Sequence, residues 1–130
     1  MDQSEKARLI EELNRPGDPI GITNIHDVGS AKMMAAMGAK AVATTAAGFA
    51  FTVGEPDGIR VSRDQMLDHC EDVVRAVNIP VSADLENGYG DDPDSVAECV
   101  ELAAEVGLVG CTIEDTSFDK AHPAYDFEIA

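Results

Sequence analysis

V-S-A-D-L-E-N-G-Y-G, residues 81–90, is the stretch from which the fold and the chemistry of this chain are inferred. Residues 79–83 have the apolar, β-branched character of a buried strand, with Pro80 tolerated at its start. Asp84 and Glu86 follow, and an extended backbone would point both carboxylates to the same side. The glycines of residues 87–90 predict a turn. An isolated acidic pair is more often a solvated turn, but at the carboxyl end of a parallel strand it indicates a hard-cation site.

Polar side chains also follow the other predicted strands. Short apolar runs cover residues 20–23, 41–45 and 108–113. The polar side chains at their ends are Asn24 and Asp27, Thr44 and Thr45, and Glu114 and Asp115. Because the carboxyl ends of parallel strands meet at one edge of a sheet, this recurrence favours a functional site over scattered surface acids.

Helices are predicted between the strands from their capping signals. Their ranges are residues 4–14, about 27–37, 62–77 and 92–106. The N-terminal signals are Ser4, Asp27 or Ser30, Ser62 with Gln65, and Asp92 followed by Pro93. Gly38 and Gly107 are predicted terminators, and Met33, Met34 and Met37 are predicted packing residues.

The connecting segments carry their own signals. The small side chains of residues 46–50 would let a ligand approach the backbone closely. Residues 54–58 are predicted to form a turn, residues 116–123 a loop, and residues 125–129 the beginning of a helix.

Strand–helix alternation predicts an α/β fold with a parallel sheet and right-handed crossovers, in a single domain over residues 1–130. A doubly wound sheet would be complete at this length, but its first turn lacks a G-x-G-x-x-G and the chain has no Walker motif. A (β/α)₈ barrel needs about 250 residues, so this chain would supply about its first four βα units, a half-barrel. Polar residues at every strand end favour the barrel.

The composition of the chain limits the classes of molecule that it could bind. The net charge is -16, from 25 acidic and 9 basic residues, which disfavours nucleic acids and anionic membranes as partners. The three cysteines, Cys70, Cys99 and Cys111, show no C-x-x-C and are predicted to be reduced and mostly buried in a cytoplasmic protein. Neither a signal peptide nor a membrane-spanning run is predicted.

Four motifs in order carry a family resemblance. They are G-I-T-N-I-H-D-V-G-S-A at residues 21–31, T-T-A-A-G-F-A-F-T-V-G-E-P-D-G at residues 44–58, S-A-D-L-E-N-G-Y-G at residues 82–90, and I-E-D at residues 113–115. From about Leu9 onward the chain resembles the isocitrate lyase/phosphoenolpyruvate mutase superfamily, and most of all its methylisocitrate lyase and phosphonate-cleaving branch. The resemblance implies a (β/α)₈ barrel that binds Mg²⁺ and 2-oxo or enol carboxylates.

The resemblance also implies roles for particular residues. Asp84 corresponds to the direct Mg²⁺ ligand, while Asp57, Glu86 and Glu114 correspond to acids that hold the metal mostly through its waters. Thr45, Ala46 and Ala47 fall on the segment that holds a substrate carboxylate, with Thr and Ala in place of the usual Ser-Gly. Lys120 lies in the gating loop, near the position of a catalytic or substrate-contacting lysine. Where the lyases carry a Cys acid in that loop, this chain has F-D-K-A-H-P at residues 118–123.

Other polar residues have two interpretations. His26 would be either a donor in the site or a structural residue, and Asp115 a loop cap or ion-pair partner. His69 and His122 are predicted on the surface and Cys111 in the strand core. Tyr89 would pack under the gating loop or cover the strand end.

Two functions are therefore expected. The first is a Mg²⁺-dependent lyase or mutase that cleaves a C–C or P–C bond in a small 2-oxo acid, through an enolate that the metal stabilises. The alternative is a non-catalytic half-barrel that self-associates. In either case a homo-oligomer is expected, because the outer strands would have open edges and the inner face, with Ile22, Val42, Val81 and Ile113, would lack its second half.

Overall fold

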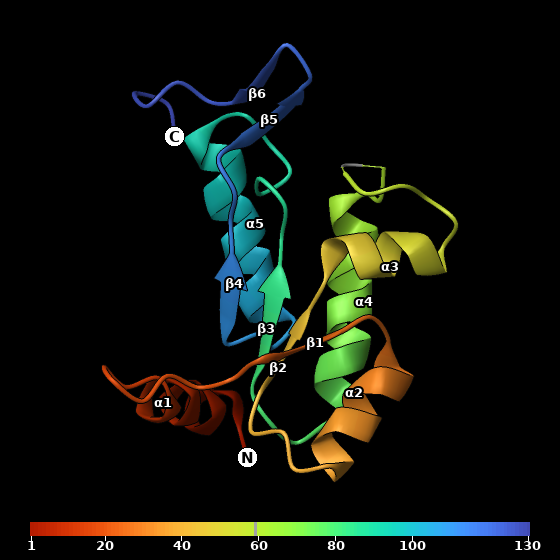
Figure 1. Ribbon diagram of the computed structural model, residues 1–130, viewed down its shortest axis with the longest axis vertical. Helices are drawn as coiled ribbons and strands as arrows, with labels where there is room; N and C mark the ends of the chain where they lie inside the picture. Colours follow the sequence, from red (N-terminus) through yellow and green to blue (C-terminus); the bar gives the residue numbers. More distant parts are fainter. Residues whose placement is uncertain (59) are drawn as a thin grey trace.

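The computed structural model describes residues 1–58 and 60–130, and these form a parallel sheet covered by helices (Figure 1). The parallel strands are β1 (Thr23–Ile25), β2 (Val42–Thr44), β3 (Val81–Asp84) and β4 (Gly110–Thr112). The helices are α1 (Gln3–Leu13), α2 (Val28–Ala36), α3 (Ala46–Thr52), α4 (Arg63–Ala76) and α5 (Pro93–Glu105). An antiparallel hairpin, β5 (Thr116–Asp119) and β6 (His122–Ala124), follows the sheet. No helix in the described ranges is long and apolar enough to cross a membrane.

The strand order decides between the two predicted architectures. The sheet runs β1-β2-β3-β4, in the same order as the chain, with every neighbouring pair parallel. Helix α2 packs on β1 and β2, α4 packs on β3, and α4 lies between α2 and α5 in one helical layer. A doubly wound sheet would reverse its strand order and carry helices on both faces. The observed order is that of successive βα units of a barrel, as predicted.

Side chains alternate strictly between the two faces of the sheet. Ile25, Thr44 and Ala83 are buried under the helices, together with the core of α4 and α5. The opposite face carries small or polar residues at the paired positions, namely Asn24, Ala43, Ser82 and Gly110. The open face of the sheet is therefore not an apolar surface.

This register corrects one prediction. Val42 and Val81 were expected on the open inner face, but they are 0% and 1% exposed. They occupy the same register level, Val42 opposite Val81, on the face that the helices cover. Ile22 and Ile113, which flank the sheet, are each 39% exposed, in agreement with the prediction.

The predicted caps are largely confirmed. Asp27 caps α2, Ser62 forms a capping box with Gln65 at α4, and Asp92 with Pro93 begins α5. Gly38, with φ +96°, follows the end of α2. The first helix begins earlier than predicted, because the Asp2 side chain accepts the Glu5 N–H and makes Asp2 the N-cap in place of Ser4.

Several predicted elements are wrong. The first strand lies at Thr23–Ile25 instead of residues 20–23. Residues 46–52, for which no helix or strand was predicted, form helix α3. Most of residues 116–123 belong to the hairpin β5–β6, and residues 125–129 contain a turn instead of a helix.

The burial of three side chains also differs from the prediction. Met33 and Met37, predicted as packing residues, are 60% and 75% exposed because they lie on the outer side of α2. His69, predicted on the surface, is buried against Phe49.

The sheet edges lead to a prediction about assembly. Within the described part of the chain, β1 and β4 each pair on one side only. Unpaired N–H and C=O groups along an edge strand template pairing with another chain. We predict that the 130-residue chain forms at least a dimer, and that association strengthens with salt because the net charge of -16 opposes it. Light scattering at low and high ionic strength measures this, and a folded monomer under both conditions would contradict it.

Candidate active site

Asp84, at the carboxyl end of β3, is held by backbone donors from two directions. The Ala46 N–H at the start of α3 donates to its Oδ2 at 3.2 Å, and the Glu86 N–H donates to its Oδ1 at 3.2 Å. The Asp84 N–H in turn donates to Oγ1 of Thr44 at 3.3 Å. Thr44, one of the polar residues predicted at the strand ends, is buried in β2 and supports Asp84. The carboxylate is thus fixed between two strands and a helix.

Glu86 lies near Asp84, as predicted, but its backbone conformation differs from the predicted one. The backbone does not stay extended, because Leu85 turns into the core and Glu86 has φ +53°. A hydrogen bond of 2.8 Å from the Gly88 N–H to the Leu85 carbonyl closes the turn. Glu86 is only 6% exposed, and its burial, followed by the nearby charges of Asp84, Asp57 and Glu114, raises its pKa to about 7.

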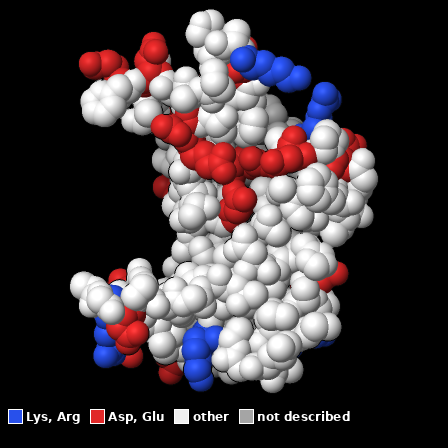
Figure 2. All heavy atoms as spheres, viewed as in Figure 1, with Lys and Arg blue, Asp and Glu red and all other residues white. Residues whose placement is uncertain are grey.

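Glu114 and Asp57 complete the set of four predicted carboxylates. The Glu114 N–H donates to the Glu86 carbonyl at 2.7 Å, which ties the end of β4 to the turn after β3. Burial, then the charges of Asp84 and Asp57, raises the pKa of Glu114. Asp57 is exposed in the loop between α3 and α4. Acidic side chains form a band across the face above the ends of β3 and β4 (Figure 2).

The chemistry of this donor set fits a hydrated divalent cation. All four groups are carboxylates, and in the described ranges none of them pairs with a lysine or arginine. No three His, Cys, Asp or Glu side chains among the described residues converge closely enough to hold a metal directly. Mg²⁺ keeps several of its waters and binds through one or two carboxylates, so acids that do not all converge on one point are compatible with it.

The segment predicted to hold a substrate carboxylate forms the first turn of α3. Thr45 is the N-cap, and its Oγ1 accepts the Gly48 N–H at 3.3 Å. The Ala46 N–H is engaged by Asp84, whereas the Ala47 N–H has no hydrogen bond to any described residue. Ala46 therefore supports the acidic cluster, and the Thr45 hydroxyl and Ala47 N–H are the groups left to donate.

Lys120 lies apart from the carboxylates. It is exposed in the turn between β5 and β6. The hairpin does approach the Asp57 loop, since the Phe118 ring lies 3.8 Å from the position of a Cβ on Gly58. At the base of the hairpin the Tyr125 hydroxyl accepts a hydrogen bond of 3.0 Å from Asn87 and donates to Asp91. This anchor was missed, because a lone Tyr gives no signal of a partner distant in the sequence.

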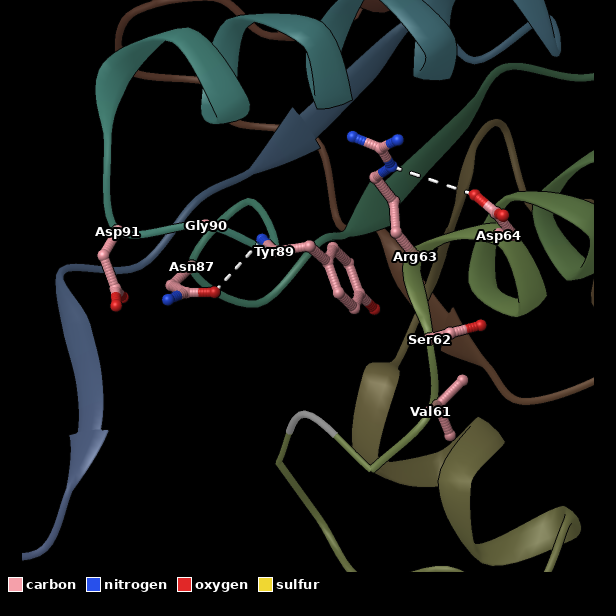
Figure 3. A pocket seen from close by; sticks show the side chains of 8 residues that line it. All are labelled: Val61, Ser62, Arg63, Asp64, Asn87, Tyr89, Gly90 and Asp91. Carbon is pink, nitrogen blue, oxygen red and sulfur yellow. Dashed lines mark hydrogen bonds and ion pairs between the residues drawn. The ribbon is translucent and has the colours of Figure 1, made fainter.

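A cavity of about 480 Å³ lies beside the turn that carries Glu86. Figure 3 shows the Tyr89 ring between the loop of residues 87–91 and the segment that leads into α4. The Tyr89 N–H donates to Oδ1 of Asn87 at 3.1 Å, and burial raises the pKa of its hydroxyl. Asp84 does not line this cavity, so the cavity adjoins the acidic cluster without containing it.

His26, which was left with two interpretations, is exposed at the end of β1, and its Nε2 lies 3.8 Å from Oδ2 of Asp27. Cys111 is half-buried in β4, and burial raises the pKa of its thiol. Neither residue has a described contact with the four carboxylates.

Successive parallel βα units with a carboxylate cluster at the carboxyl edge define the class of (β/α)₈-barrel enzymes that work at the strand ends. Within that class, the family model described as phosphoenolpyruvate phosphomutase matches residues 10–130. The chain belongs to this family.

Three relatives illustrate the match. A Burkholderia cenocepacia structure described as a candidate lyase/mutase is 48% identical with a TM-score of 0.93, and the match covers 98% of this chain and 46% of that one. A 2-methylisocitrate lyase from Halalkalibacterium halodurans is 27% identical over 118 residues, which is 91% of this chain and 39% of the lyase. A phosphonopyruvate hydrolase solved with oxalate and Mg²⁺ is 20% identical with a TM-score of 0.85, over 99% of this chain and 44% of that one, and shares the fold. The chain spans less than half the length of each.

The crowding of carboxylates predicts a pH-dependent cost in stability. The pKa of Glu86 is about 7 in the folded chain, above its ordinary 4.5, so the carboxyl group ionises less readily in the folded state than in the unfolded state. The contribution of Glu86 to stability should be undiminished below pH 4.5, fall as the pH rises to about 7, and stay lower above it. We expect Glu86→Gln to stabilise the metal-free chain at pH 8 by on the order of 1–3 kcal/mol, with little effect at pH 4.

Urea unfolding in the presence of a chelator measures this effect. Glu101→Gln is the matched control, because Glu101 is exposed on α5 and forms no ion pair with a described residue. If Glu86→Gln is no more stable than the unsubstituted chain at pH 8, the cost assigned to Glu86 is wrong.

Proposed function

We propose that the chain provides the metal-binding half of a Mg²⁺-dependent lyase or mutase acting on a small 2-oxo acid of the oxaloacetate or methylisocitrate kind. The observation that carries the proposal is the set of four carboxylates, without a described basic partner, around Asp84 at the carboxyl edge of the sheet. Membership of the family supports it, as does the similarity to a 2-methylisocitrate lyase.

The four acids would divide the work of holding the metal. Asp84 would be the direct ligand, because backbone N–H groups fix both of its oxygens. Glu86, Glu114 and Asp57 would accept hydrogen bonds from the waters of the ion. When bound, Mg²⁺ supplies the positive charge that stabilises the enolate left when a C–C or P–C bond breaks.

The first turn of α3 would orient the substrate. The Thr45 hydroxyl and the Ala47 N–H would donate to a substrate carboxylate, while Ala46 keeps Asp84 in place. Lys120 is proposed as a catalytic residue on the hairpin, whose Phe118 ring lies 3.8 Å from the position of a Cβ on Gly58, beside Asp57. Because the chain carries a net charge of -16, an anionic substrate needs the metal's charge to enter this site.

Replacement of the direct ligand tests the metal assignment. Asp84→Asn keeps the shape of the side chain and an acceptor for the Ala46 N–H but removes the charge. We expect Mg²⁺ affinity, measured by calorimetry, to fall at least about 100-fold, since even outer-shell partners cost about 10–100-fold. Asp68→Asn, at an exposed position of α4, should bind Mg²⁺ normally. Undiminished affinity in folded Asp84→Asn would exclude Asp84 as the ligand.

A second proposal is that the chain alone is non-catalytic and mainly self-associates. It is favoured by the open edges of β1 and β4 and by the chain's share of its relatives, 39% of the 2-methylisocitrate lyase. The two proposals differ in one measurement, which is turnover of oxaloacetate, 2-methylisocitrate and phosphonopyruvate by the purified 130-residue chain. Mg²⁺-dependent turnover that Asp84→Asn abolishes would support the enzyme and reject this alternative.

A further inference from the structure

Helix α3 is fastened to helix α4 by a stack of two rings. The imidazole of His69, on α4, lies parallel to the ring of Phe49, on α3, with 4.0 Å between the ring centroids and 8° between the planes. His69 is 8% exposed, and no part of the proposed chemistry uses it. A short helix such as α3 needs tertiary contacts of this kind to stay in place.

The buried imidazole has no hydrogen-bond partner for one of its nitrogens. Among the described residues, Nε2 of His69 is the buried side-chain nitrogen or oxygen atom left without one. The charged and titratable groups that face it are Asp72 on α4 itself, and His26 and Asp27 at the junction of β1 and α2. Phe49, the partner from α3, offers no acceptor. A neutral ring fits this environment, whereas a charged ring would bury an N–H donor that has no hydrogen-bond acceptor in the stack.

The same place joins α3 to the end of β1. Gly48 of α3 lies against His26, since a Cβ on Gly48 would be 3.1 Å from the His26 Cβ. Two residues before Gly48 in the same helix, the Ala46 N–H donates to Oδ2 of Asp84. The position of α3 therefore decides whether one of the backbone donors of Asp84 stays in place.

We propose that protonation of His69 is an acid-sensitive switch that releases α3 from α4 and removes the support that Ala46 gives to Asp84. The imidazolium turns out of the stack toward the carboxylates of Asp72 and Asp27, which the neutral ring does not need. The release of α3 stands apart from the proposed function. Only its effect on Mg²⁺ binding depends on Asp84 being a ligand.

The direction of the effect follows from burial. Burial lowers the pKa of His69 from its ordinary 6.5, while Asp72 and Asp27 oppose this and His26 adds to it. The stack contributes its full stability above pH 6.5 and loses it as the pH falls through the folded-state pKa. Glu86 changes the stability in the opposite direction over part of this pH range. The experiment must therefore separate the effect of His69 from that of Glu86.

Amide hydrogen exchange of residues 46–52 provides that comparison. We expect the protection factors of α3 to fall about tenfold for each pH unit below the ordinary pKa of histidine, once corrected for intrinsic rates. His69→Phe keeps a stacked ring that cannot be protonated, so its α3 should stay protected at pH 5. His122→Phe, at an exposed histidine of the hairpin, should behave like the unsubstituted chain.

An acid-induced loss of protection in His69→Phe equal to that in the unsubstituted chain would overturn the proposal. If that variant does not fold, His69→Gln takes its place in the experiment. Its side chain is also uncharged, so the expected result is the same. A titration of the His69 ring by nuclear magnetic resonance tests, without any substitution, whether protonation of this ring causes the release of α3. A pKa below 6.5 supports the switch, and a value at or above 6.5 overturns it.

Discussion

The hydrogen bond from the Ala46 N–H to Asp84 is the interaction on which the candidate site depends. It joins the first turn of α3 to the end of β3, two elements that lie 38 residues apart in the chain. A half-buried polar group needs hydrogen-bond partners in place of the water it has lost. Two backbone N–H groups donate to the oxygens of Asp84, and neither belongs to a side chain that a mutation would replace. The geometry of the carboxylate is therefore a property of the backbone.

The other acids of the site are in the opposite situation. Glu86 is buried among like charges, and its pKa shows that the folded chain tolerates the charge poorly without a counter-ion. A protein seldom maintains such crowding for stability, because replacing the acid with a neutral isostere would relieve it. If the cluster binds a cation as proposed, the cost of its crowded charges and its affinity for the ion have the same origin.

The sequence was most informative where local chemistry decides the structure. Helix caps at Asp27, Ser62 and Asp92, and the polar ends of the strands, depend on neighbours a few residues away and were predicted well. The misses depend on distant contacts. The buried position of His69 follows from Phe49 on another helix, and the turn at Glu86 from Leu85 entering the core. Residues 46–52 include three alanines and follow the N-cap Thr45, but the run is too short to show a helical period, and its helix is stabilised by what it packs against.

The order of the strands has a consequence for how this fold is built. Within the four-stranded sheet each strand pairs with the next strand along the chain, so among the described residues no pairing of this sheet waits for a segment from the far end. Each of these pairings closes one crossover, residues 45–80 being the longest, and the entropic cost of closing a loop grows only slowly with its length. Each βα unit can therefore settle on the edge that the preceding unit presents, in the order in which a ribosome delivers them.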